Sequence, residues 1–142
     1  MIFLDTSLLV RRFVDDEGID PSAALASPGM PLLVSAIARV EFRSAMSRRR
    51  RSGRLDEPGF RRILAAFEED MADADVVPVD EVVLARAAAL VERRPLRSLD
   101  AIQLASAQVA AERSPEPLRF GSADARLNAA AKAEGLALLL EE

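Results

Sequence analysis

The sequence predicts an α/β protein in which a short, mainly parallel central sheet is covered by helices on both faces. Two features of its 142 residues predict this fold: short apolar segments of strand length alternate with longer segments that have helical apolar spacing, and no internal repeat or low-complexity linker interrupts the alternation. Strands that are separated by helices pair in parallel and are buried on both faces. A chain of this length predicts one domain, residues 1–142.

The first strand is predicted at residues 1–4, an apolar run that ends at Asp5. Residues 6–14 predict a helix with Thr6 or Ser7 as its N-cap, because a hydroxyl oxygen accepts a hydrogen bond from the free N–H groups of a first helical turn.

The next segments predict, in order, a loop at residues 15–22, a short helix at 23–27 and a second strand at 31–34. Ser35 is the predicted N-cap of a long helix, residues 36–51. That helix is expected to end at Ser52 and Gly53, because glycine readily adopts the left-handed conformation that closes helices.

A third long helix is predicted at residues 57–74, where Pro58 suits the first turn and apolar residues recur at helical spacing. A short strand is predicted at residues 76–79. The helix predicted at residues 81–94 ends before Pro95, because proline cannot continue the hydrogen bonds of a helix.

The last part of the chain begins with a strongly apolar helix, predicted at residues 98–112 with Ser98 as its N-cap. It is followed by a predicted strand at residues 118–123, a helix at 124–135 closed by Gly135, and a final strand at 136–140.

Composition excludes several kinds of chemistry. The chain has no cysteine, which excludes disulfides and thiol nucleophiles, and no histidine, which excludes a Ser-His-Asp triad and the usual zinc sites. Carboxylates are the main groups left for catalysis. No apolar run approaches the roughly 18 residues of a membrane span, and no signal peptide is expected, so a cytoplasmic location without membrane association is the default expectation.

Three isolated acids fall at one edge of the predicted sheet. Asp5 ends the first strand, Asp124 follows the strand at residues 118–123, and Asp100 lies in the first turn of its helix. In open α/β sheets, ligands bind in the crevice beyond the carboxyl ends of the strands. We therefore expect Asp5 and Asp124 on that edge, with Asp100 within reach of it.

Glu41 lies on the apolar stripe of its predicted helix, one turn after Ile37 and one turn before Ala45. A lone carboxylate buried there costs several kcal/mol unless it is paired or binds a metal ion. An ion pair with Arg39 or Arg43 is an alternative, although neither is three or four residues from Glu41.

Each of the four acids also has a purely structural explanation: Asp124 as an N-cap, Asp100 as a complement to the helix dipole, Asp5 as a residue that orients the next turn, and Glu41 as a member of an ion pair. These alternatives stay open for each acid taken singly. A joint explanation is that all four converge on one crevice, where clustered carboxylates repel one another unless a cation lies among them. Oxygen ligands favour Mg²⁺ or Mn²⁺.

Charge is unevenly distributed. The net charge is −4, but residues 39–62 contain nine arginines and three acids, a local charge of +6. The centre of this basic segment is Arg48, Arg49, Arg50 and Arg51. It is either a contact surface for a polyanion or a solvated helix end, and the patch by itself does not decide between them.

Four stretches resemble PIN-domain ribonucleases, and most closely the VapC-type toxins of bacterial toxin–antitoxin pairs. They are FLDTSLLV, SAIARVEF, LRSLDAIQLASA and FGSADARLNAAAKAEGL, in the expected order and spread along essentially the whole chain. The third stretch is the most specific. The resemblance implies a three-layer α/β/α PIN-like fold.

By this resemblance Asp5, Glu41, Asp100 and Asp124 form the acidic quartet of the active site. Thr6 or Ser7, and Ser122, match hydroxyl positions that support the site in the family. Some relatives carry a further acid shortly after the fourth, where this chain has Arg126 and Asn128. A second metal ion is therefore less expected here.

The predicted activity is metal-dependent cleavage of RNA. With no histidine to act as a base, a metal ion would lower the pKa of a bound water and neutralise charge on the phosphate. Asp5 and Asp100 are predicted to bind Mg²⁺ or Mn²⁺ directly, and Asp124 and Glu41 to complete its shell through water or to hold a second ion. The resemblance implies products with a 5′-phosphate and a 3′-hydroxyl.

The resemblance also implies partners: a small VapB-type antitoxin that covers the acidic pocket, and a second copy of the chain in a homodimer. Arg48 to Arg51 are candidates for contact with either RNA or the antitoxin. The only aromatic residues are six phenylalanines, which argues against a large base-stacking platform and favours recognition of a folded RNA such as a tRNA or an rRNA loop.

Two alternative functions remain. A phosphatase of the haloacid dehalogenase type needs a second aspartate two residues after the first, where this chain has Ser7, and no Walker-type nucleotide motif occurs. The second alternative is a catalytically silent PIN-fold module that binds RNA or protein. Intact acids at all four positions argue against it, because clustered carboxylates repel a polyanion.

Overall fold

The computed structural model describes residues 1–14 and 31–140, in which five parallel strands form one sheet in the order β3-β2-β1-β4-β5. The strands are β1 (Ile2–Leu4), β2 (Leu32–Ser35), β3 (Asp75–Val77), β4 (Arg119–Gly121) and β5 (Ala137–Leu138). The prediction of a short parallel sheet is confirmed.

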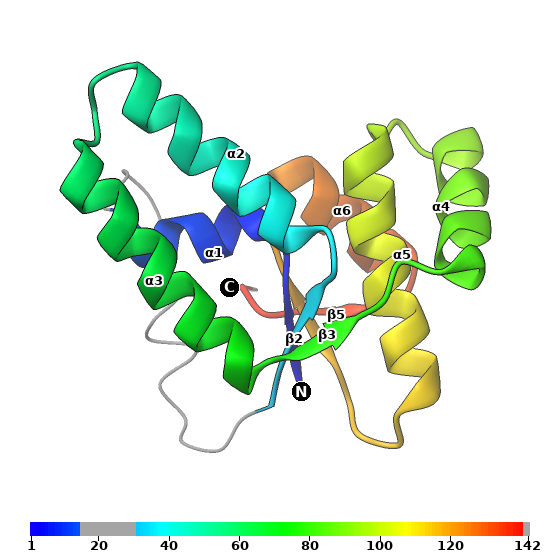
Figure 1. Cartoon of the computed structure of the whole chain (residues 1–142). Helices are drawn as coiled ribbons and strands as arrows, with labels where there is room; N and C mark the ends of the chain where they lie inside the picture. Colours follow the sequence, from blue (N-terminus) through cyan, green and yellow to red (C-terminus); the bar gives the residue numbers. More distant parts are fainter. Residues whose placement is uncertain (15–30, 141–142) are drawn as a thin grey trace.

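Helices cover both faces of this sheet, as Figure 1 shows. They are α1 (Thr6–Phe13), α2 (Ala38–Arg51), α3 (Glu57–Asp73), α4 (Glu81–Arg93), α5 (Ser98–Arg113) and α6 (Ala125–Ala133). Buried residues of α1, α2 and α3 share one hydrophobic core, and those of α4, α5 and α6 share the other. This is the three-layer α/β/α fold that the sequence predicted.

The two cores are separated by the alternation of side chains along the strands. Ile2 and Leu4 of β1 pack against α1, α2 and α3, whereas Phe3 between them packs against the opposite helices. Successive residues of a strand point to opposite faces of its sheet. Between α2 and α3 the rings of Phe42 and Phe67 stack with their centroids 3.9 Å apart.

The predicted N-caps of three helices are wrong. Asp5 occupies the N-cap of α1, Ile37 that of α2 and Arg97 that of α5, and none of their side chains makes a capping hydrogen bond. The reason lies in the backbone: the first helical hydrogen bonds end on the carbonyls of these three residues. The hydroxyl of Ser7 binds Asp5, and that of Ser35 accepts from Ser106 at 3.2 Å and, at 3.4 Å, from the N–H of Ile37, just before α2 begins.

Three predicted strands are shorter than expected. The strand predicted at residues 76–79 is β3, which ends at Val77 because Pro78 has no N–H to donate to the sheet. The strands predicted at 118–123 and 136–140 are reduced to β4 and β5. Beyond Gly121 the chain leaves the sheet to form the site described below.

The predicted loop at residues 15–22 and the short helix at 23–27 lie outside the described residues. Within the described part of the chain, no helix is long and apolar enough to cross a lipid bilayer.

Candidate active site

The carboxyl ends of β1 and β4 meet where the order of the strands changes direction. β1 is the central strand, with β2 on one side and β4 on the other, and the backbone N–H of Asp5 donates to the carbonyl of Gly121 across this junction at 2.9 Å. Such a switch point leaves a crevice beyond the strand ends, because the connections leave on opposite faces of the sheet. Asp5 therefore emerges at the base of this crevice.

Asp5 is a buried carboxylate, only 6% exposed, and two hydroxyls hold one of its oxygens. Ser7 donates to Oδ2 at 2.5 Å and Ser122 donates to the same atom at 2.8 Å. Burial raises the pKa of Asp5, the two hydroxyls oppose this rise, and the charge of Asp100 adds to it. The structure thus orients Asp5 while leaving its charge largely uncompensated.

Ser122 is itself fixed by the residues around the start of α6. Its backbone carbonyl accepts from the side-chain amide of Asn128 at 2.8 Å, and its N–H donates to Asn128 Oδ1 at 3.2 Å. The backbone N–H of Asp124 donates to Ser122 Oγ at 3.0 Å, and that of Ala123 donates to Ser7 Oγ at 2.9 Å. The predicted supporting hydroxyls therefore link Asp5 to the α6 segment.

Glu41 enters the same crevice from the first turn of α2. Its Oε1 accepts from Thr6 Oγ1 at 2.9 Å and from Gln103 Nε2 at 2.7 Å. Burial raises the pKa of Glu41, these two hydrogen bonds lower it, and the charges of Asp5 and Asp100 raise it further. Glu41 is therefore a half-buried carboxylate held by neutral donors.

The alternative in which Glu41 belongs to an ion pair is wrong. Arg39 and Arg43 both bind Glu68 of α3, at 3.4 Å and 2.8 Å. Both side chains are about half exposed, and neither lines the cleft that Glu41 lines. Its hydrogen bonds come from Thr6 and Gln103 instead.

Gln103 is a residue of the site that the sequence reasoning missed. It lies on α5 with 0% exposure, and its Nε2 donates both to Glu41 Oε1 and, at 3.0 Å, to Thr6 Oγ1. Its Oε1 is buried without a hydrogen-bond partner. The available signal was a glutamine about one turn after Asp100, among apolar residues of a strongly apolar helix.

Asp100 and Asp124 lie at the starts of two helices. Asp100 is in the first turn of α5, where Arg97 Nε lies 3.4 Å from its Oδ2. Asp124 is the N-cap of α6, and its Oδ1 accepts from the N–H of Arg126 at 2.9 Å. Asp124 is therefore the N-cap that its structural explanation predicted, through Oδ1. Its other carboxylate oxygen does not take part in the cap.

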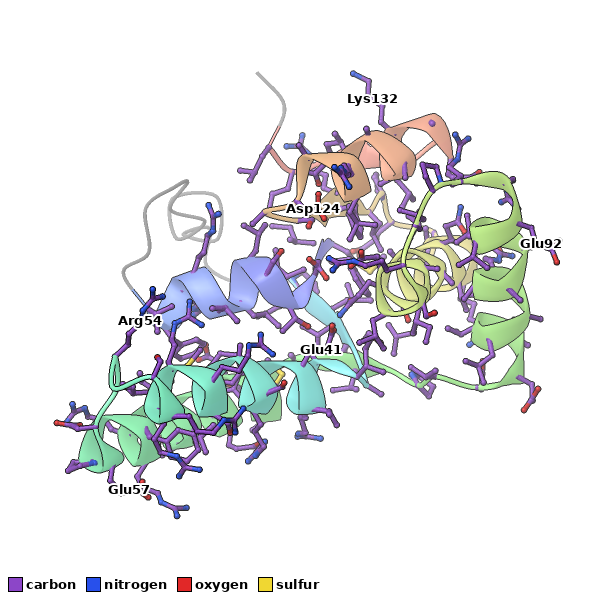
Figure 2. All side chains as sticks on the ribbon, turned by 90° about the horizontal axis from the view of Figure 1, so that it is seen from above. Glu41, Arg54, Glu57, Glu92, Asp124 and Lys132 are labelled. Carbon is purple, nitrogen blue, oxygen red and sulfur yellow. The ribbon has the colours of Figure 1, made fainter. Side chains whose placement is uncertain are left out.

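All four predicted acids line one cleft of about 370 Å³, together with Thr6 and Ser7. Figure 2 shows Glu41 on the α2 ribbon and Asp124 at the start of the α6 ribbon, with the α1 ribbon between them in this view. Ser122 is buried behind Asp5. Within residues 1–14 and 31–140, however, no group of three acidic side chains is arranged closely enough to hold a metal ion.

The basic segment divides between the cleft and the outer surface. Arg48 and Arg49 line the cleft, as does Arg11 of α1. Arg50 instead binds Glu57 at 3.2 Å and lies 3.8 Å above the ring of Phe60. Arg51 is exposed and does not line the cleft. Only the first two of the four predicted arginines reach the acids' cleft.

Three solved structures share this fold. A toxin–antitoxin complex from Klebsiella pneumoniae is 19% identical, with a TM-score of 0.67 and full coverage (100%) of both chains. VapC20 from Mycobacterium tuberculosis, a sarcin–ricin loop cleaving toxin, is 18% identical, with a TM-score of 0.67 and 100% coverage of both chains. FitAcB from Neisseria gonorrhoeae is 18% identical, with a TM-score of 0.68, covering 97% of this chain and 96% of that one. At these identities the likeness shows the fold alone.

A search of curated protein sequences finds no match to this chain. The family model of the PIN domain, in contrast, matches residues 2–133. Among the described residues, this match includes the strands β1 to β4, the helices α1 to α6 and all four acids of the cleft. The chain belongs to the PIN domain family.

Proposed function

We propose that this chain is a metal-dependent endoribonuclease that acts as the toxin of a toxin–antitoxin pair. The observation that carries the proposal is the convergence of Asp5, Glu41, Asp100 and Asp124 from four separate segments on one cleft. Folding brings these carboxylates together against their mutual repulsion, and burial raises the pKa of both Asp5 and Glu41. Such an arrangement is typical of a site that functions with a bound cation.

Membership of the PIN family and the shared fold with toxin structures support the proposal. One of those structures is a sarcin–ricin loop cleaving toxin, which makes a folded rRNA loop a candidate substrate here, alongside tRNA. Another is a toxin–antitoxin complex, which supports an antitoxin partner. We include in the proposal an antitoxin that covers the cleft, a homodimer, and action in the cytoplasm.

The residues of the cleft fit a divalent cation. Mg²⁺ keeps several waters and is bound through one or two carboxylates, so the absence of a three-acid cluster among the described residues is compatible with it. Asp5 and Asp100 would hold Mg²⁺ or Mn²⁺ directly, and Asp124 and Glu41 would complete the shell. The bound ion would supply acidity to a water and neutralise charge on the scissile phosphate.

The protein's own groups prepare this site. Ser7 and Ser122 hold Oδ2 of Asp5, while Thr6 and Gln103 hold Oε1 of Glu41. Each carboxylate is therefore fixed by one oxygen before any ligand binds. Fixing the groups in advance lowers the entropy lost on binding. Hydrolysis of an RNA phosphodiester at this site is proposed to leave a 5′-phosphate and a 3′-hydroxyl.

The test compares the wild type with Asp5→Asn and Asp100→Asn, each incubated with total cellular RNA and Mg²⁺ or Mn²⁺, with and without EDTA. We expect discrete fragments from the wild type only, abolished by EDTA. Asp75→Asn is the matched control, because Asp75 is exposed at the opposite end of the sheet, where β3 begins. Asp5→Asn is expected to fold, because a neutral amide avoids the cost that raises the pKa of Asp5.

Cleavage that persists in both Asp5→Asn and Asp100→Asn would contradict the proposed site. If the wild type, free of any antitoxin, cleaves no RNA under any of these conditions, the endoribonuclease proposal fails. The alternative of a catalytically silent PIN-fold module would then be favoured, provided that the protein still binds RNA or a partner.

A further inference from the structure

A second cavity of about 250 Å³ adjoins the acidic cleft on the side of α5 and α6. The two cavities share Asp100, Asp124 and Arg97. The other lining residues of the second cavity are Pro95, Leu96, Arg126 and Leu127. A ligand that occupies the acidic cleft can therefore extend directly into this second cavity.

Arg97 and Arg126 bring two guanidinium groups to the second cavity. The side chain of Arg97 is 88% exposed, and its contact with Asp100 is long, at 3.4 Å. Such an exposed ion pair is weak and exchanges readily for another anion. The guanidinium of Arg126 has no ion pair or hydrogen bond within residues 1–14 and 31–140, and its side chain is exposed. Both groups are available to a ligand.

Arginines therefore flank the acids from both layers of helices. Arg11 and Arg48 line the cleft from α1 and α2, which cover one face of the sheet. Arg97 and Arg126 lie at the starts of α5 and α6, which cover the other face. A ligand that meets both groups must cross the acids between them, and it must carry negative charge on each side of that crossing.

We propose that the second cavity is a phosphate-binding subsite for the RNA strand, in which Arg97 and Arg126 bind a phosphate next to the one that is cleaved. The inference rests on the proposed function. Guanidinium groups bind phosphate oxygens in pairs of parallel hydrogen bonds, and phosphates recur along a nucleic acid strand at a regular spacing. The strand would run across the sheet edge, from α2 over the acids to the start of α6.

The charge distribution favours RNA over a protein partner as the ligand of this subsite. A strand that places one phosphate at the acids, where a cation is needed, necessarily places its neighbouring phosphates beyond them. The two cavities offer that sequence of charges, with arginines on both sides of the carboxylates.

The test measures affinity for a labelled synthetic RNA hairpin at several salt concentrations, in the Asp5→Asn background so that no cleavage occurs. Arg97→Gln, Arg126→Gln and the double variant are compared with Arg119→Gln, whose exposed side chain lies at the start of β4, at the opposite end of the sheet. Each lost phosphate contact is expected to weaken binding and to reduce the slope of log affinity against log salt by about 0.7.

Cleavage rates are measured in parallel with Arg97→Gln and Arg126→Gln in the otherwise wild-type chain, where we expect a higher KM and a smaller change in kcat. If the double variant binds RNA with the affinity and salt slope of Arg119→Gln, the inference is overturned while the nuclease proposal stands. If the double variant has a changed affinity only for a protein partner, and not for RNA, the inference is overturned as well. If the wild type neither binds nor cleaves RNA, the proposed function fails and this inference fails with it.

Discussion

Asp5 and Glu41 are both held in the folded protein at a cost in free energy. Burial raises the pKa of each carboxyl above its ordinary value near 4, although hydroxyl and amide donors oppose the rise. A carboxyl with a raised pKa in the folded state contributes stability that is fully present below its ordinary pKa and is lost as pH rises through the folded value. The metal-free protein is thus least stabilised by these groups at neutral pH, where the proposed cation would compensate most.

Gln103→Leu tests how the protein controls the pKa of Glu41. The amide of Gln103 is the strongest of the hydrogen bonds that lower the pKa of Glu41, so its loss should raise that pKa further. The acid limb of the cleavage rate against pH should therefore move to higher pH. The free energy of unfolding should fall by about 1.5–3 kcal/mol at neutral pH, and by less at acid pH, where the carboxyl of Glu41 is protonated in both the folded and the unfolded state.

Gln108→Leu is the matched control, because it makes the same substitution on the same helix at a residue that is not among the hydrogen-bond partners of Glu41. The Oε1 of Gln108 is buried and accepts no hydrogen bond, so replacing Gln108 by leucine breaks no bond to this atom and should not lower the free energy of unfolding on that account. An equal shift of the pH–rate profile in both variants would contradict a specific role for Gln103.

At the scale of elements, the helices fall into two groups by how they begin. α3 and α4 have side-chain caps, in which Asp56 accepts from Gly59 at 2.7 Å and Asp80 accepts from Val83 at 3.0 Å. The helices α1, α2 and α5 begin without such a cap, and these are the helices whose first turns carry Thr6, Glu41 and Asp100. Local rules are often broken at functional sites.

The start of α6 combines both roles in one residue, and two substitutions separate them. Asp124→Asn keeps an oxygen for the cap, so stability should change by only a few tenths of a kcal/mol, whereas cleavage should fall by about 10–100-fold if the charge supports the metal. Asp124→Ala should lose the same activity and also about 1 kcal/mol of stability. Urea unfolding and a cleavage assay on both variants measure the two effects independently.

If Asp124→Asn retained full activity, Asp124 would be only a cap, as its structural explanation in the sequence allowed. The Asp80→Asn and Asp80→Ala pair at the start of α4 provides the control, since Asp80 is a cap that does not line either cavity. Asp80→Ala should be less stable than Asp80→Asn by the same amount as in the Asp124 pair, and neither Asp80 variant should lose cleavage activity.

Across the whole molecule, the basic segment at residues 39–62 is a weaker source of free positive charge than its +6 suggests. Arg39 and Arg43 are paired with Glu68, and Arg50 with Glu57, so α3 neutralises much of the outer face of α2. Arg48 instead lines the acidic cleft, where its guanidinium donates to the hydroxyl of Ser44 at 3.0 Å. The candidate contact surface for RNA or an antitoxin is therefore narrower than the four predicted arginines, Arg48 to Arg51.

Arg48→Gln is expected to weaken RNA binding and to reduce its salt slope by about 0.7, because one phosphate contact is lost. Arg43→Gln removes the same charge from the same helix, but Arg43 already binds Glu68, so it should change neither quantity. Titration of RNA into both variants at several salt concentrations measures the difference. Unchanged RNA binding together with weaker antitoxin binding by Arg48→Gln would assign Arg48 to the antitoxin instead.

The alternation of strands and helices was predictable because it depends on local periodicity. Apolar residues at strand and helix spacing, with Gly53 and Gly135 at helix ends, indicated each described element. The N-caps were not predictable in the same way, since Ser7 accepts from the N–H of Ala123 and Ser35 from the hydroxyl of Ser106, two residues that tertiary packing brings to them. Two predicted strands were too long, because the chain leaves the sheet at Pro78 and at Ser122.

The sequence by itself determined the parallel α/β architecture and the four acids, because strand ends and helix starts are set by neighbours along the chain. Only the tertiary structure decided how those acids are held. Gln103 and Glu41 are 62 residues apart, and Ser122 and Asp5 are 117 apart, so no local pattern could pair them. The second cavity likewise arises only because α5 and α6 begin side by side at the sheet edge, which places Arg97 and Arg126 around one space.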